Sequence, residues 1–87
     1  GIFMKSITVT IHDKEGLHAR PAGILNKAAK GFACTTTMTK EGKDADIKRI
    51  FAIMGLKIKC GDELTITCDG ADEDAAIAEI GKIFETL

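Results

Sequence analysis

The sequence of 87 residues lacks both a long apolar run and an imbalance of charge. No apolar stretch approaches the roughly 18 residues that are needed to cross a bilayer, and no basic-then-apolar signal segment stands at the N-terminus. Lysine and arginine together number 12 and aspartate and glutamate 13, so the net charge is only −1. This balance favours neither a nucleic-acid partner nor an anionic membrane surface. We therefore expect a soluble, cytosolic protein that does not insert into a membrane.

Cysteine is scarce and is not spaced for metal binding. The chain has three cysteines, Cys34, Cys60 and Cys68, without a CxxC pair or a Cys/His ligand pattern. An odd number without such spacing is typical of reduced thiols that are buried or partly buried. We expect neither a metal nor a cofactor, and the sequence assigns no role to these cysteines.

The length of the chain limits its architecture. With 87 residues, of which 45% are hydrophobic, we expect one domain over residues 1–87 with a packed core. Such a domain has room for one sheet layer and one helix layer, but not for a deep enclosed active site. The residues 1–3 that precede Met4 could be an expression scar, in which case the natural chain begins at Met4.

One short stretch, GLHARPA at residues 16–22, contains the only proline of the chain. Proline is tolerated in the first turn of a helix, because the N–H that it lacks would have no intrahelical partner there. Pro21 therefore predicts a helix that starts at Ala19, with His18 as its N-cap. Histidine is not a usual N-cap, so its presence suggests a function. Its ring would lie above free N–H groups and the positive end of the helix dipole, where anions bind.

Periodicity predicts four strands and three helices. Alternating β-branched residues predict strands at residues 4–11, 34–39, 43–47 and 64–69, with a hairpin turn at 40–43. Apolar residues at helical spacing predict helices at 19–30, at 47–58 with an interruption near Gly55, and after Asp72.

Local signals predict how two of these helices begin and end. Gly31 is placed to end the first helix in a left-handed conformation. Asp72 is a candidate cap of the last helix, whose acidic first turn suits the helix dipole. The element order is β-α-β-β-α-β-α, and three apolar helix stripes must be buried. We therefore predict an α+β fold, a two-layer open-faced sandwich with a four-stranded antiparallel sheet and three helices on one face.

The stretch at residues 16–22 resembles the phosphorylation loop of the HPr family, the histidine-containing phosphocarrier proteins of the bacterial sugar phosphotransferase system. Two more segments agree. KRIFAIMGL at 48–56 resembles the second helix of the family, and GDELTI at 61–66 with GADE at 70–73 resembles its last strand and the start of its third helix. The similarity covers nearly the whole chain without a gap, and it implies the same fold.

The resemblance implies that His18 accepts a phosphoryl group on Nδ1 from phosphorylated enzyme I and donates it to sugar-specific enzyme IIA proteins. An unperturbed imidazole is largely neutral at cytosolic pH, so a nucleophilic nitrogen is available without a separate base. Arg20 offers a planar fork of donors that favours the transferring group, whose charge is spread over its oxygens. His12 has no such surroundings, and we expect it to be an ordinary surface histidine.

The resemblance also implies a docking face for these partners. It consists of apolar residues of the second helix and of cations around the histidine: Lys27, Lys48, Arg49, Ile50, Phe51 and Met54, beside Arg20. A small apolar patch ringed by cations suits brief contacts with acidic partners. The competing interpretation is that the apolar members belong to the core, and periodicity does not separate the two. We expect at least Phe51 to be exposed.

Several alternatives stay open at the level of sequence. Arg49 stands where the family has its regulatory serine, so we expect no serine-directed phosphorylation there. A regulatory paralogue of the nitrogen-related branch would keep His18 but use other partners, and an interaction module would never be phosphorylated. A self-standing enzyme is disfavoured, because the loop offers no second catalytic residue or metal site. A monomer is the simplest expectation, and the sequence does not say which sugar is served.

Overall fold

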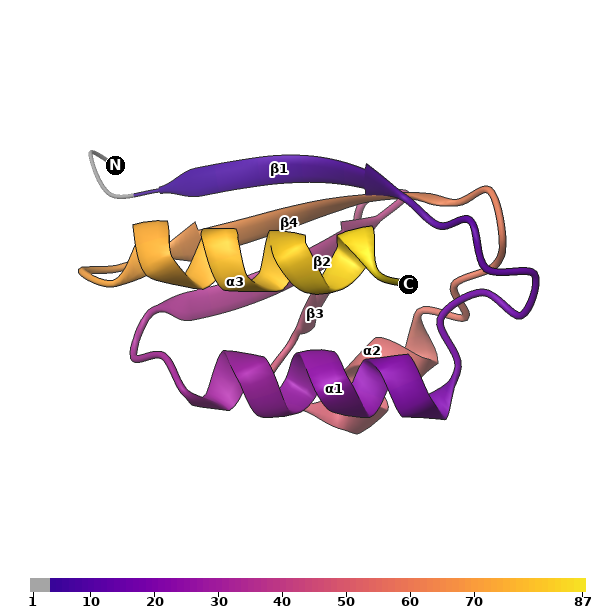
Figure 1. The fold of residues 1–87 in the computed structure, drawn as a ribbon, viewed down its shortest axis with the longest axis horizontal. Coiled ribbons are helices and arrows are strands. Elements are labelled where there is room, and N and C mark those ends of the chain that lie inside the picture. The colour runs from indigo at the N-terminus through magenta and orange to yellow at the C-terminus, as the bar shows by residue number, and fades with distance from the viewer. Residues whose placement is uncertain (1–3) are drawn as a thin grey trace.

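The computed structural model describes residues 4–87, so the interpretation of residues 1–3 as a scar lies outside the described residues. Figure 1 shows the seven elements in the predicted order. Their bounds are β1 Lys5–Thr10, α1 Ala19–Lys30, β2 Thr35–Lys40, β3 Lys43–Asp46, α2 Ile50–Gly55, β4 Glu63–Asp69 and α3 Glu73–Glu85.

The four strands form one antiparallel sheet in the order β1-β4-β2-β3. The last strand of the sequence is therefore an inner strand, paired with β1 on one side and with β2 on the other. Ile66 lies at its centre, opposite Ile7 of β1 and Met38 of β2. In Figure 1 the helices α1 and α3 run side by side in front of the sheet, and α2 lies beside α1. The two-layer α+β fold is confirmed.

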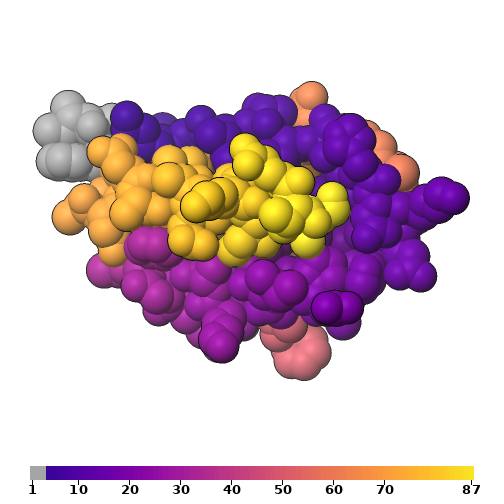
Figure 2. Space-filling view, viewed as in Figure 1, coloured from indigo at the N-terminus to yellow at the C-terminus, as the bar shows by residue number. Residues whose placement is uncertain are grey.

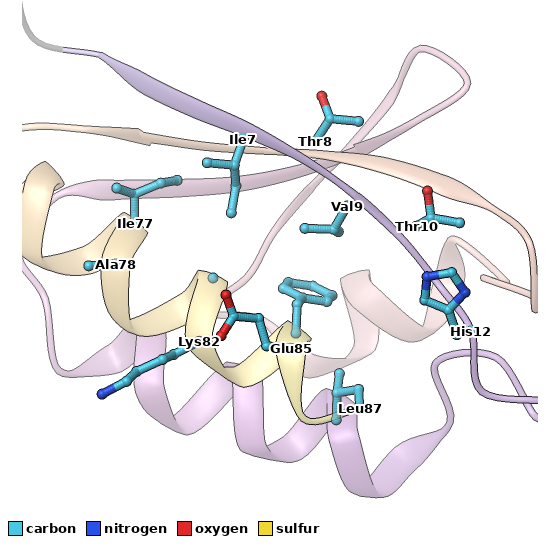
Figure 3. A pocket seen from close by; sticks show the side chains of 12 residues that line it. Ile7, Thr8, Val9, Thr10, His12, Ile77, Ala78, Lys82, Glu85 and Leu87 are labelled. Atoms are coloured by element: carbon cyan, nitrogen blue, oxygen red, sulfur yellow. The ribbon is translucent and has the colours of Figure 1, made fainter.

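The core fills the space between the sheet and the helices. Figure 3 shows the alternation along β1: Ile7 and Val9 point toward α3, whereas Thr8 and Thr10 point away from it. Each large apolar side chain that is fully buried here contributes roughly 1.5 to 3 kcal/mol. The largest apolar side chains without solvent contact are Leu25, Met38, Ile47, Ile53, Leu64, Ile66 and Ile80.

The hairpin between β2 and β3 is confirmed at the predicted position. Its two central residues, Glu41 and Gly42, have φ angles of 49° and 80°. Positive φ at both positions is typical of a two-residue turn whose twist matches that of the strands, and glycine adopts it at no steric cost.

Three local predictions were wrong in whole or in part. Gly31 is not left-handed: its φ of −77° is that of a right-handed helix, and its N–H bonds to carbonyl oxygens of the preceding turn. The second helix ends at Gly55, near the predicted interruption, but it is shorter than the predicted range of 47–58. Ile47 and Ile58 are buried in the core, but they belong to the segments before and after the helix. Asp72 is the N-cap of α3, as predicted, but its side chain makes no cap bond. Its carboxylate instead accepts the N–H groups of Ala33 and Cys34 at 2.8 and 2.9 Å.

The cysteines only partly follow the expectation of burial. Cys34 and Cys68 are buried free thiols, whereas Cys60 is exposed. Burial raises the pKa of the Cys68 thiol to about 12 and also raises the pKa of Cys34, so both thiols stay protonated at neutral pH.

Within residues 4–87, no helix combines the length and the apolar character that a membrane crossing requires.

Candidate functional site

The loop before α1 is held in place by its own backbone and by the segment before β4. The Asp13 carbonyl accepts the Gly16 N–H at 2.9 Å, and the Ile58 carbonyl accepts the Leu17 N–H at 3.2 Å. Gly16 has a φ of 69°, and a Cβ atom there would collide with the Ile58 carbonyl oxygen. Only glycine fits this close approach, and the buried Leu17 side chain anchors the loop in the core. The next residue, His18, is thereby fixed in position.

His18 is the N-cap of α1, as predicted, and Ala19 is the first helical residue. Its backbone is extended, and its ring makes no cap hydrogen bond with the helix. The N–H groups of Ala19 and Arg20 have no intrahelical acceptor in an α-helix, and Pro21 has no N–H. Unpaired donors at the positive end of the helix dipole can therefore receive an anion beside the imidazole.

The imidazole is accessible, with 38% of the His18 side chain exposed. It lines a shallow hollow of about 300 Å³ together with Arg20, Pro21 and Ile24 of α1 and the residues that follow α3. Arg20 is exposed and lies on the rim of this hollow. The structure thus brings the two predicted catalytic residues to one open site, where a guanidinium can approach a group carried on the ring.

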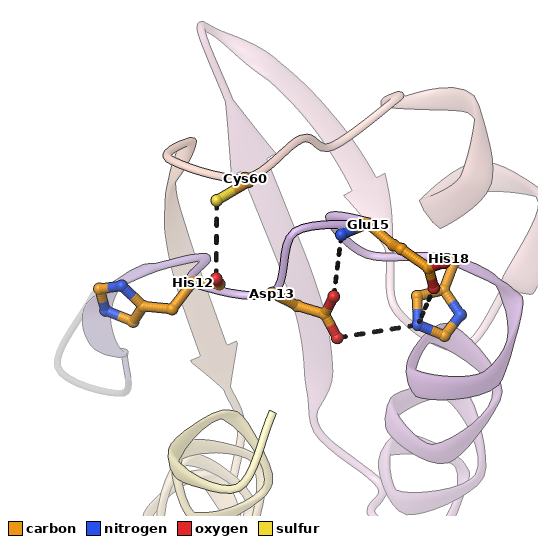
Figure 4. A network of polar contacts seen from close by, with 5 residues as sticks. All are labelled: His12, Asp13, Glu15, His18 and Cys60. Carbon is orange, nitrogen blue, oxygen red and sulfur yellow. Dashed lines mark hydrogen bonds and ion pairs between the residues drawn. The ribbon is translucent and has the colours of Figure 1, made fainter.

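Two carboxylates approach the ring, and in Figure 4 the dashed lines from both meet at the same ring nitrogen. The Nε2 atom of His18 lies 3.6 Å from Glu15 Oε2 and 3.9 Å from Asp13 Oδ2. The ligand atoms of these three residues lie within 4.8 Å of one another, which is close enough to share a cation. All three side chains are in contact with water, which competes with such ligands, and we assign no metal to them.

The apolar residues of the expected docking face are on α2. Phe51 is 87% exposed, which confirms the expectation of an exposed phenylalanine, and Met54 is 38% exposed. Figure 2 shows the α2 segment projecting beyond α1 at the lower edge of the molecule. Ile50 is half-buried, and a Cβ atom at Gly23 would contact its Cδ1 at 3.8 Å, so it packs toward α1. Phe51 and Met54 are therefore the members that a partner could cover.

The cations of the expected docking face have different surroundings. Lys27 of α1 and Arg49, the N-cap of α2, are exposed. The Lys48 ammonium instead donates to the Cys34 carbonyl at 2.8 Å and is partly buried. Lys48 therefore joins the start of β2 to the segment before α2, and its charge is less free to meet a partner than that of the other two.

Three residues of the site were missed by the sequence analysis. Asp13 and Glu15 belong to a polar loop, and only the fold shows that their carboxylates turn toward His18. Ile24 is 46% exposed although it lies on α1, where it borders the hollow that contains the histidine. The exposure of Ile24 could have been predicted from the sequence, because Ile24 lies outside the apolar helical stripe that ends at Phe32.

A more voluminous hollow, of about 610 Å³, lies between β1 and α3 and contains neither His18 nor Arg20 (Figure 3). Its floor is formed by Ile7, Val9 and Phe84, which pack against the core. The volume of a hollow therefore does not identify the functional site in this molecule, because His18 and Arg20 line the smaller one.

Comparison with known proteins agrees with the geometry. The family model described as "PTS HPr component phosphorylation site" matches residues 5–86. The phosphocarrier protein HPr of Mycoplasma capricolum is 43% identical over 77 residues, which cover 88% of this chain and 86% of that protein. HPr of Haemophilus influenzae is 39% identical over 84 residues, with coverage of 97% and 99%.

Solved structures show the same architecture. A histidine-containing phosphocarrier protein of Mycoplasma superposes with a TM-score of 0.89 at 40% identity, over 91% of this chain and 90% of that one. Crh, a catabolite repression protein of Bacillus subtilis described as a domain-swapped dimer, superposes with a TM-score of 0.76 at 31% identity, over 90% of each chain. The arrangement of strands and helices around the histidine is therefore shared with proteins of known structure.

Proposed function

Because this chain belongs to the HPr family of phosphocarrier proteins, we propose that its His18 accepts a phosphoryl group from phosphorylated enzyme I and passes it to an enzyme IIA protein. The observation that carries the proposal is the half-exposed imidazole at the N-cap of α1, beside Arg20. An open hollow suits a group that one protein must load and another must unload.

The transfer follows from the chemistry of the ring. The Nδ1 lone pair attacks phosphorus, and the bond from phosphorus to the donor breaks with its electron pair going to the leaving atom. Charge is spread over the three equatorial oxygens during this step. The free N–H groups at the start of α1 and the guanidinium of Arg20 can donate to these oxygens. No residue of the loop needs to act as a base, since a neutral imidazole already has a free nitrogen.

The decisive experiment incubates the protein with enzyme I and phosphoenolpyruvate and measures its intact mass before and after mild acid. We expect one acid-labile phosphoryl group on the wild type and none on His18→Ala. Arg20→Ala should still fold but should gain the group about ten- to a hundredfold more slowly, because a donor to the transition state is lost. His12→Ala is the matched control, since His12 is exposed and lies outside the hollow. A wild type that gains no phosphate, or a His18→Ala variant that gains as much, would refute the proposal.

We further propose that partners dock on the exposed residues around this hollow. Phe51 and Met54 supply apolar surface, and Lys27 and Arg49 supply positive charge. Such a combination suits acidic partners that bind briefly, because charge speeds the encounter more than it prolongs the complex. Within this face Lys48 has a structural contact of its own.

Arg49 bears on regulation at this face. It occupies the N-cap of α2, where a phosphorylated serine would place negative charge beside the apolar residues. We propose that its fixed positive charge keeps the face competent for docking. Residues 46–56 contain no serine, threonine or tyrosine, so the charge of Arg49 is what must be tested. Arg49→Glu should raise severalfold the KM of phosphorylated enzyme I for this protein, and an unchanged KM would contradict the idea.

We propose that the chain acts as a monomer, although relatives with dimeric structures exist. The edge strand β3 exposes Lys43, Asp44 and Asp46, and the other edge strand begins with an exposed Lys5. Charged side chains on edge strands oppose pairing with another sheet. Light scattering should therefore give a mass near 9.3 kDa, and a mass about twice as large would overturn the proposal.

A further inference from the structure

The two carboxylates beside His18 have no part in the transfer as described so far. Both approach Nε2, and Figure 4 shows the other ring nitrogen on the far side of the ring from the Asp13 carboxylate. One ring nitrogen is therefore in a negative environment, and the other is turned away from it.

We infer that Asp13 and Glu15 are positioning residues that hold the proton of the neutral His18 ring on Nε2 and so leave Nδ1 free to accept the phosphoryl group. This inference rests on the proposed function and adds the choice of nitrogen to it. A negative charge near one nitrogen favours the tautomer that carries the proton there. The same arrangement orients the histidine of a catalytic triad, where a carboxylate faces the nitrogen that does not react.

The loop presents the two carboxylates differently. Asp13 is fixed, because its Oδ1 accepts the Glu15 N–H at 2.8 Å while its Oδ2 faces the ring. The Glu15 side chain is 76% exposed and makes no hydrogen bond among the described residues. The distances of 3.6 and 3.9 Å exceed those of hydrogen bonds, so the effect in the resting protein is electrostatic. Asp13 should therefore carry the larger share of the orientation.

The carboxylates also match the change of charge during transfer. When Nδ1 forms its bond to phosphorus, the proton on Nε2 stays in place and the ring becomes a cation. Two negative groups beside Nε2 stabilise that charge. Arg20 acts on the other side of the reaction, since it neutralises the oxygens. The ring thus lies between a negative loop and a positive helix start.

The experiment compares the wild type with Asp13→Asn, Glu15→Gln and the double variant. The readout that is independent of activity is the tautomer of His18, from long-range ¹H–¹⁵N correlation spectra of the unphosphorylated protein. We expect the wild type to carry its proton on Nε2, and the double variant to show a larger share of the Nδ1–H form. The rate of phosphoryl transfer from phosphorylated enzyme I should fall about threefold in each single variant and about tenfold in the double variant.

The controls separate orientation from general charge and from folding. Asp69→Asn removes one exposed carboxylate at the end of β4 and should change neither readout. Glu15→Asp keeps the charge and should restore most of the rate. The difference between wild type and double variant should shrink at high salt, because exposed charges are screened. Thermal melting shows whether Asp13→Asn has loosened the loop, and Glu15→Gln remains informative in that event, since its side chain makes no hydrogen bond among the described residues.

The outcomes are distinct. A wild type that takes up phosphate while the double variant keeps its tautomer and its rate would overturn the inference and leave the proposed function intact. A wild type that takes up no phosphate would refute the proposed function, and the spectra alone would then decide whether the carboxylates set the tautomer.

Discussion

The Thr36 hydroxyl lies in the core without a hydrogen-bond partner among the described residues. Thr36 is fully buried in β2, directly opposite Cys68 of β4. A buried polar group without a partner has lost its water and gained nothing in return, which costs about 1 to 3 kcal/mol. Valine has nearly the same shape without the hydroxyl, so this position tests the cost directly.

We expect Thr36→Val to raise the free energy of unfolding by about 1 kcal/mol, measured by urea denaturation. Thr67→Val is the matched control, because its hydroxyl lies 3.0 Å from the Ser6 hydroxyl and can bond to it. That change should bring no gain in stability. A Thr36→Val protein that is less stable than wild type would show that the hydroxyl has a partner in solution.

Single residues also show where prediction from sequence stops. His18, Arg20 and Pro21 could be placed because their signals are local: a proline in a first turn fixes the start of the helix. Asp13 and Glu15 could not, since a polar loop carries no mark of the direction in which it turns. The prediction that the Asp72 side chain caps α3 failed for the same reason, because the sequence does not show which way the carboxylate turns. Its position before α3 is typical of a cap, but its carboxylate is taken by N–H groups from the loop between α1 and β2.

At the scale of the element, α1 carries a glycine in its interior. Gly23 is half-buried, and a Cβ atom there would meet only the Cδ1 of Ile50, at an ordinary contact distance of 3.8 Å. We expect Gly23→Ala to raise the free energy of unfolding by about 0.5 to 1 kcal/mol, because glycine is the more flexible residue in the unfolded chain. Chemical denaturation measures the gain.

Gly16→Ala is the contrasting control for this glycine. Its Cβ atom would collide with the Ile58 carbonyl, and its positive φ disfavours alanine. That variant should lose stability and should slow phosphoryl transfer, since the loop that positions His18 would move. Equal effects of the two substitutions would mean that the environment of Gly23 is tighter than the structure shows.

The short helix α2 separates a docking role from a folding role. Phe51 and Ile53 lie two residues apart, but Phe51 is 87% exposed and Ile53 is 1% exposed. We expect Phe51→Ala to change the free energy of unfolding by less than about 0.5 kcal/mol and to raise severalfold the KM of phosphorylated enzyme I for this protein as the phosphoryl acceptor.

Ile53→Ala should behave in the opposite way. It should cost about 2 to 4 kcal/mol of stability because it leaves a cavity in the core, and transfer by the fraction that remains folded should be nearly normal. If Phe51→Ala leaves the KM unchanged, the exposed ring is not part of the docking face.

Elements were predictable where one rule dominates. The bounds of α1 and the β2–β3 turn follow from proline and from a glycine after a short polar stretch. The second helix was overextended, because Ile47 and Ile58 continue its spacing of three and four residues although they belong to the segments on either side. Residues outside a helix can face the same core, and periodicity does not distinguish them. The prediction of a left-handed Gly31 was wrong, because the first helix ends with this residue in a right-handed conformation.

At the scale of the whole molecule, two carboxylates join segments that are distant in sequence. Asp72 bonds the loop between α1 and β2 to the start of α3. Asp62 lies 2.9 Å from the Lys40 ammonium and accepts the Lys59 N–H at 2.7 Å, which joins the end of β2 to the turn before β4. The antiparallel order β1-β4-β2-β3 needs such ties, because β4 must insert between strands made earlier in the chain. These long-range contacts carry no local signal in the sequence.

Both carboxylates predict a loss of stability in acid. Backbone N–H donors, chiefly that of Ala33, lower the pKa of Asp72, and the Lys59 N–H followed by Lys40 lowers the pKa of Asp62. A pKa that is lower in the folded than in the unfolded state means that the unfolded chain binds more protons. The stabilisation is therefore complete above the unfolded pKa of about 3.9 and is lost as the pH falls through the folded values.

We expect the melting temperature, followed by circular dichroism, to vary little between pH 7 and 5 and to fall steeply below about pH 4. Asp72→Asn should melt several degrees lower than wild type at pH 7, because an amide has one acceptor oxygen for two N–H donors and no charge. The gap between the two curves should close toward pH 2, where the wild-type carboxyl is protonated as well. Asp69→Asn, at the exposed end of β4, should follow the wild-type curve throughout. Curves for Asp72→Asn and wild type that stay parallel down to pH 2 would show that the charge of Asp72 does not stabilise the fold and that its pKa is not lowered.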